Sequence, residues 1–141
     1  MIQSIVDGII NAIRTEYDTS FRIYTESTAQ GLKEPCFSIL CINPSGEREI
    51  GNRYKRFFPF NITYFPSSDE PISECNQVCE TLLGLLTEIN TDIGVLHSSD
   101  NMSGNIVDGK LQFSVQYQVF AKLVEVPTDN MADLSVDTGT V

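Results

Sequence analysis

The strongest constraint on the fold is a strict alternation of side chains near the end of the chain. Every second residue from Leu111 to Val119 is apolar, and the residues between them are glutamine or serine. Successive side chains of a β-strand point to opposite faces, so this segment predicts a strand with the core on one side only. Asp108-Gly109 separates it from the apolar pair Ile106-Val107, which is typical of a tight hairpin with a type I′ turn.

Two other segments have the periodicity of helices. Apolar residues recur every three or four positions between Ile2 and Ile13, which predicts a helix that continues to about residue 17. A wider stripe of the same period predicts a second, more buried helix ending near Asn90. Ser67 and Glu70 have the spacing of a capping box at its start.

The rest of the chain predicts shorter strands and turns. Strands are expected at residues 21–25, 36–42, 53–65 and 93–97, with a polar loop at 27–35 and a turn at 43–46. The nearly unbroken apolar run at 36–42 indicates a central strand covered on both faces. Pro59 cannot donate to a sheet ladder, so the strand that contains it is predicted to be an edge strand, or bulged at that point.

Together these elements predict an α+β fold, in which a mainly antiparallel sheet carries two helices on one face. A chain of 141 residues fits one domain, which we place at residues 1–126. Residues 127–141 carry acids, no base and no periodicity. They are expected to be an acidic C-terminal tail, or an arm that becomes ordered on a neighbouring molecule.

The net charge of -10 comes entirely from the second half of the chain. Residues 1–65 hold seven acids and seven bases, whereas residues 66–141 hold twelve acids against Lys110 and Lys122. Such a chain does not grip a phosphate backbone, which Lys and Arg bind. The acidity is explained either by solubility or by a surface that faces DNA without binding it, or that meets a basic partner.

No metal, cofactor or catalytic site is expected. Cys36 and Cys41 lie in a strand-like run, and Cys75 and Cys79 share an apolar helix face, so the four thiols are predicted to pack as small hydrophobic side chains rather than to bind zinc. His97 is the only histidine, and no phosphate-binding loop or nucleophile motif is present. The protein is therefore not expected to be an enzyme.

One basic cluster stands out. Four of the nine bases, Arg48, Arg53, Lys55 and Arg56, lie within nine residues and beside aromatic side chains. They either protect an exposed turn and strand edge with charge, or form a subunit interface that meets the acidic half of another copy. Nucleic-acid binding by this cluster is disfavoured by the surrounding negative charge.

The opening segment does not have the features of a signal peptide, because it lacks a basic leader and its apolar residues are interrupted by Asp7, Asn11 and Arg14. No apolar run reaches the roughly 18 residues that a membrane span requires. We therefore expect a cytosolic protein.

Besides the opening helix, the chain contains several distinctive short motifs: GLKEPCF (31–37), Asn43-Pro44, G-x-R-Y (51–54), YFPSS (64–68), the ECN-x-V helix start (74–78) and the VDG hairpin (107–109). In these features the chain resembles a family of phage tail terminator proteins from prophages and phage-tail-like particles of Gram-positive bacteria. The resemblance covers about residues 1–124.

The resemblance implies a structural virion protein that assembles in the host cytoplasm. Such proteins form a hexameric ring that caps the tail tube, ends its polymerisation and joins it to the head–tail connector. In contractile tails the ring can also engage the sheath, and the genome passes through its lumen. The alternatives are another neck, head–tail adaptor or tube component, a small ligand-binding domain or enzyme, or a DNA-binding module.

Overall fold

The computed structural model describes residues 1–26, 33–99, 101–126 and 131–137. In chain order the elements are α1 (Ile2–Arg14), β1 (Arg22–Tyr24), β2 (Cys36–Cys41), β3 (Ser45–Arg48), β4 (Arg53–Phe65), α2 (Pro71–Leu85), β5 (Glu88–Thr91), β6 (Gly94–His97), β7 (Ser103–Val107), β8 (Lys110–Val126) and β9 (Met131–Asp137). None of the described helices is long and apolar enough to cross a membrane.

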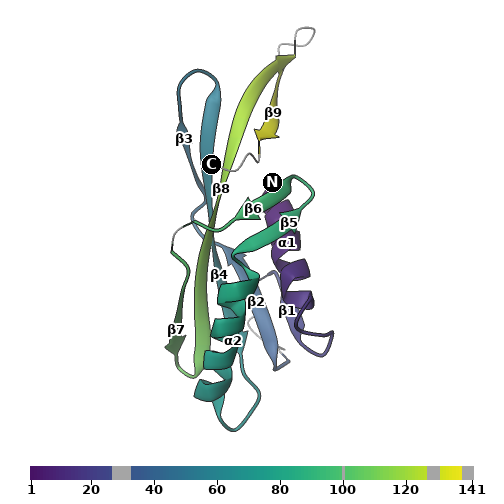
Figure 1. The fold of residues 1–141 in the computed structure, drawn as a ribbon, viewed down its shortest axis with the longest axis vertical. Helices are drawn as coiled ribbons and strands as arrows, with labels where there is room; N and C mark the ends of the chain where they lie inside the picture. The colour runs from purple at the N-terminus through teal and green to yellow at the C-terminus, as the bar shows by residue number, and fades with distance from the viewer. Residues whose placement is uncertain (27–32, 100, 127–130, 138–141) are drawn as a thin grey trace.

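Seven of the described strands form one sheet. Its central order is β1-β2-β4-β8-β7, while β3 pairs with the beginning of β4 and β9 pairs with the end of β8. Only β1 and β2 pair in parallel, and the other pairs are antiparallel. Figure 1 shows α1 and α2 on one side of this sheet, with the β3–β4 and β8–β9 hairpins extending beyond them. The predicted α+β class is confirmed.

The core lies between the sheet and the two helices. Even-numbered residues of β4 from Phe58 to Tyr64, and odd-numbered residues of β8 from Leu111 to Ala121, are buried on one face. The apolar stripe of α1 and the inner face of α2 pack against them. Burying a side chain of the size of Phe113 stabilises the fold by about 2–3 kcal/mol, so this layer holds the molecule together.

Of the two alternatives predicted for the strand that contains Pro59, an edge strand or a bulge, the edge strand is wrong. This strand, β4, is central and pairs with β2 and β3 on one side and with β8 on the other. Pro59 lies opposite the break between β2 and β3, where its carbonyl accepts a hydrogen bond from the Ile42 amide at 2.8 Å. Its missing N–H therefore faces the one place along that side of β4 where the ladder is interrupted.

The expectation that residues 36–42 are covered on both faces is also wrong. β2 is central, but Leu40 and Ile42 remain 39% and 44% exposed. The reason is that the described helices cover only one face of the sheet (Figure 1). The opposite face carries the polar residues of β4 and β8, including Asn61, whose Nδ2 donates to Gln112 Oε1 at 2.9 Å.

The second helix is shorter and less buried than its sequence predicts. It ends at Leu85, and Glu88–Thr91 form strand β5, which pairs with β6. The hydroxyl of Tyr117 donates to the carbonyl of Leu86 at 2.7 Å and thereby satisfies a group at the end of the helix. Buried residues are more numerous in α1 than in α2, so the more buried helix is the first one.

The start of α2 is held by Glu74 rather than by the predicted capping box. Its carboxylate accepts hydrogen bonds from the Tyr64 hydroxyl and from the amides of Ser67 and Ser68, the latter two at 3.2 and 3.1 Å. Burial tends to raise the pKa of Glu74, but these hydrogen bonds outweigh that effect and lower the pKa. Burial and the bond to Glu74 raise the pKa of Tyr64 far above its ordinary value.

The remaining predictions have separate outcomes. Asp108 and Gly109 both have positive φ, at 54° and 73°, which confirms the type I′ hairpin. Of the predicted loop at 27–35, residues 27–32 lie outside the described part. In the C-terminal segment, β9 pairs along β8 through residues 131–137. That this segment acts as an arm outside a domain of residues 1–126 stays a prediction.

Candidate subunit interface

The side chains that could bind a metal or take part in catalysis are dispersed in the described part of the structure. The described residues contain no cluster of three or more His, Cys, Asp or Glu side chains that could hold a metal ion. His97 and Glu88 face each other across the β5–β6 pair, with 3.8 Å between Nδ1 and Oε2, and both side chains are about half exposed at 49% and 58%. An exposed pair of this kind contributes little to stability and forms no enclosed site.

All four cysteines are free thiols, and burial raises the pKa of each of them. Cys36 and Cys75 are fully buried, whereas Cys41 and Cys79 are partly exposed. The prediction of core thiols is therefore confirmed for Cys36 and Cys75. A raised pKa keeps a thiol protonated and unreactive at neutral pH.

The four bases singled out in the sequence come together on the β3–β4 hairpin. Residues alternate between faces along each strand, and Gly46 pairs with Arg56 while Arg48 pairs with Tyr54. Arg48 and Arg56 therefore share the face on which the helices lie. Arg53 and Lys55 point to the opposite face of the sheet. We call these two sets the helix-side bases and the outer-face bases.

The two sets differ in what holds them. Lys55 lies over the rings of Phe57 and Phe120, with its Nζ at 5.4 and 5.7 Å from the ring centroids. Arg48 donates through Nε to the carbonyl of Gly51 at the hairpin tip, at 3.4 Å. Within the described part of the chain, none of the four bases lies within 4 Å of a carboxylate.

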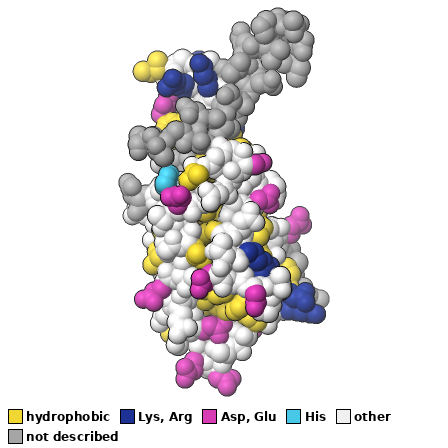
Figure 2. All heavy atoms as spheres, turned by 45° about the vertical axis from the view of Figure 1, so that its right-hand side comes forward, with side chains coloured by type: hydrophobic (Ala, Val, Ile, Leu, Met, Phe, Trp, Pro, Cys, Tyr) yellow, Lys and Arg dark blue, Asp and Glu magenta, His cyan; other side chains and the backbone are white. Residues whose placement is uncertain are grey.

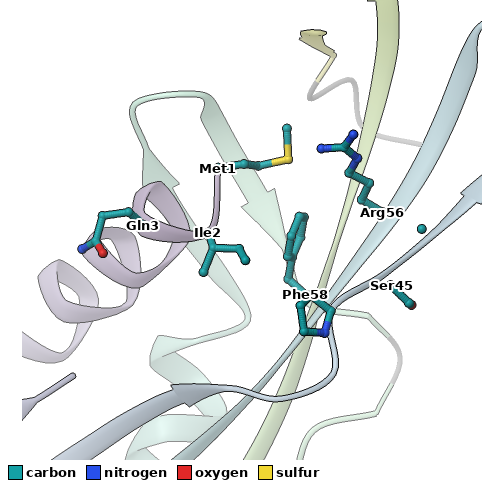
Figure 3. A pocket seen from close by; sticks show the side chains of 8 residues that line it. Met1, Ile2, Gln3, Ser45, Arg56 and Phe58 are labelled. Carbon is teal, nitrogen blue, oxygen red and sulfur yellow. The ribbon is translucent and has the colours of Figure 1, made fainter. Parts of the chain in front are cut away.

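A pocket lies where this hairpin leaves the body of the molecule. It has a volume of about 550 Å³ and is lined by Met1, Ile2, Gln3, Pro44, Ser45, Gly46, Arg56 and Phe58. In Figure 3 the side chains of Met1 and Arg56 extend toward each other from opposite sides, with Ile2 and Phe58 below them. This shoulder pocket, as we call it, has an apolar floor and one guanidinium at its rim, which suits an apolar group beside a carboxylate.

Charge is unevenly spread over the surface. Figure 2 shows a group of Lys and Arg side chains at the end of the molecule beyond the helices, whereas over the helix-covered body Asp and Glu side chains predominate, with some Lys and Arg among them. The sequence indicates the bases and the aromatic residues beside them, but Ile50 was not predicted as part of this surface. Ile50, at the hairpin tip, is 95% exposed. In the sequence, exposure of Ile50 was indicated only by its position directly before Gly51, where a turn is expected.

The fold and this surface define a class of protein: a small α+β domain with a basic hairpin and an apolar pocket on its surface. Within that class the family is shown by comparison. A family model described as phage tail terminator protein matches residues 4–130, and the chain belongs to this family. A comparison with curated proteins finds no match. The resemblance seen in the sequence is thus confirmed, and the family is one of structural proteins of the virion tail.

Proposed function

We propose that the protein ends the growth of a phage tail by capping the tail tube as a ring of six copies. The observation that carries this proposal is the family match, which spans nearly the whole described domain. In this role the ring joins the tube to the head–tail connector and, in a contractile tail, also contacts the last sheath ring. It assembles in the host cytoplasm and remains in the virion neck.

The shape of the single chain supports this assembly role. The β3–β4 hairpin extends beyond the layer formed by the helices (Figure 1). All four residues of β3 are exposed, and β3 has an unpaired edge in the described residues. An open edge and an exposed tip such as Ile50 are features that natural proteins usually cover. A neighbouring subunit in a ring would cover them.

The charge distribution supports the same role. We propose that the hairpin that carries Arg48, Arg53, Lys55 and Arg56 lies at a contact between copies and faces the acidic second half of the neighbour, and that residues 127–141 form an arm outside the main domain. A ring in which each copy uses two different surfaces is a heterologous assembly that closes on itself. The net charge of -10 suits a lumen through which DNA passes without binding.

The experiment that tests the function measures tube length. Tail tube protein is polymerised alone and with a stoichiometric amount of this chain, and lengths are measured by negative-stain electron microscopy. Capping predicts shorter tubes with a ring at one end. Tubes of unchanged length with bare ends would contradict the proposal, and rings that bind the connector but not the tube would favour a head–tail adaptor.

A further inference from the structure

The surface opposite the basic hairpin combines acidic and apolar side chains. The loop before α2 carries Asp69 and Glu70, both exposed, and Ile72 in the first turn of α2 is 60% exposed. Asp108 is exposed in the neighbouring β7–β8 turn. These four residues form what we call the acidic corner, which lies at the far end of the molecule from the β3–β4 hairpin (Figure 1).

Contacts within the chain place the parts of this corner side by side. The Cys75 Sγ lies 3.7 Å from the carbonyl oxygen of Gly109, so the β7–β8 turn lies against the beginning of α2. Ile72 is three residues before Cys75 and therefore lies on the same face of the helix, one turn nearer the N-terminus of α2. One base, Lys110, also lies here, but its Nζ is over the ring of Phe65, 5.0 Å from the centroid.

The acidic corner and the shoulder pocket are complementary in both chemistry and arrangement. The pocket offers an apolar floor of Met1, Ile2 and Phe58 with Arg56 at its rim. The corner offers an exposed isoleucine preceded by two carboxylates within three residues, a separation of at most about 10 Å. Arg48 lies two residues along β3 from Gly46, about 7 Å from the pocket, and extends the positive charge.

We propose that the acidic corner of one copy docks into the shoulder pocket of the next copy. Ile72 enters the pocket between Met1, Ile2 and Phe58, and Asp69 and Glu70 pair with Arg56 and Arg48. The contact joins two different surfaces of the same chain, which is the kind of contact that closes a ring. This inference rests on the proposed ring and assigns its subunit contact to the helix-side bases, leaving the outer-face bases outside it.

The test uses two charge-reversed variants of the full chain. One is Arg48→Glu with Arg56→Glu, and the other is Asp69→Lys with Glu70→Lys. Like charges then face each other across the contact, so each variant alone should need at least about tenfold more protein for half-maximal ring formation. Arg48, Asp69 and Glu70 are exposed and Arg56 is half-buried at the pocket, so thermal unfolding of each monomer should stay close to that of the wild type.

Mixing the two variants is the decisive step. Each variant keeps the surface that its partner has lost, and the two reversed surfaces are again opposite in charge. An equimolar mixture should therefore assemble into rings in which the variants alternate, at a concentration close to that of the wild type, as read by native mass spectrometry. Failure of the mixture to assemble would overturn the inference.

Matched controls separate this contact from a general effect of charge. Arg53→Glu with Lys55→Glu reverses the outer-face bases of the same hairpin, and Glu80→Lys reverses an exposed acid farther along α2. Both should assemble like the wild type. Ile72→Ser removes only the apolar group and should weaken assembly about tenfold, because it removes roughly the burial free energy of an aliphatic side chain.

The outcomes also distinguish this inference from the proposed function. A wild-type chain that forms no ring and leaves tubes uncapped contradicts the function itself. A wild-type chain that forms rings, with charge-reversed variants that form them equally well, leaves the function intact and overturns the docking of the acidic corner. Control variants that lose the ring as fully as the test variants would also overturn it.

Discussion

Two glycines in helices provide a matched test of the packing. Gly8 in α1 and Gly84 in α2 are both replaced by alanine, which by helix propensity alone would stabilise the protein by up to about 1 kcal/mol each. Their surroundings differ. A Cβ at Gly84 would have no atom within 4 Å, whereas a Cβ at Gly8 would lie 2.7 Å from Thr91 Cγ2 and 3.0 Å from the carbonyl oxygen of Asn90.

The neighbours of Gly8 have little freedom to move. The carbonyl of Asn90 belongs to the backbone of β5, which is hydrogen-bonded to β6. Thr91 cannot simply rotate, because its hydroxyl donates to the carbonyl of Gly94 at 2.7 Å and accepts from the amide of Ile93 at 3.2 Å. Overpacking of this kind costs about 1–3 kcal/mol, which exceeds the gain in helix propensity.

We therefore expect opposite signs for the two substitutions. Gly8→Ala should lower the free energy of unfolding by about 1 kcal/mol and the Tm by roughly 4 °C, and Gly84→Ala should raise both slightly. Urea titration and thermal unfolding followed by circular dichroism provide the measurement. If Gly8→Ala were as stabilising as Gly84→Ala, the close packing of α1 on β5 would be refuted.

Three further predictions concern the hydrogen bonds of Glu74 and Tyr117. Glu74→Gln should destabilise the fold by about 1–3 kcal/mol at pH 7 in urea titrations, because the charged acceptor of the Tyr64 hydroxyl and the Ser67 amide is lost. The pKa of Glu74 is lower in the folded protein, so its contribution is full above its ordinary pKa and disappears as pH falls through the folded value. Below about pH 4.5 the free energy of unfolding should therefore fall more steeply with decreasing pH in the wild type than in Glu74→Gln. Equal slopes for the two proteins would contradict this role of Glu74. Tyr117→Phe should cost about 1–2 kcal/mol in thermal unfolding, because it leaves the Leu86 carbonyl without its donor, and an unchanged Tm would exclude that hydrogen bond.

The sequence predicts the elements whose apolar pattern is long and regular. The α1 stripe, the alternation in β8 and the Asp108-Gly109 turn all appear where they are expected, because each pattern fits only one backbone period. The segment 53–65 is also a strand over its full predicted length. What failed was its position in the sheet, since a proline is compatible with a central strand when its neighbour is interrupted opposite it.

Short elements were harder to predict because few residues define their period. Ile89 fits the α2 stripe and is equally buried as part of β5, so the sequence cannot distinguish the two over four residues. β3 is fully exposed and carries no alternation of apolar and polar residues. It forms because the chain at this point runs alongside β4 and pairs with it. This cause is tertiary, so no local pattern in the sequence indicates it.

On the surface too, features that are local in the sequence could be predicted, and features that depend on the fold could not. The basic cluster was evident as a run of charges, and its residues lie on one hairpin. Their separation into two faces depends on the register of β3 against β4, and the shoulder pocket depends on the N-terminal end of α1 lying beside that hairpin. Neither relation is local in the sequence, so only the folded chain brings Met1, Ile2 and Arg56 together.

The most direct test of the account is the mass of the assembled protein in solution. Native mass spectrometry of the purified full chain, over a range of concentrations and at moderate ionic strength, measures how many copies associate. A tail-terminating ring predicts a species of six times the 15.7 kDa of one chain, closed and without larger polymers. A chain that stays monomeric at high concentration, even with tube protein present, would contradict the central claim.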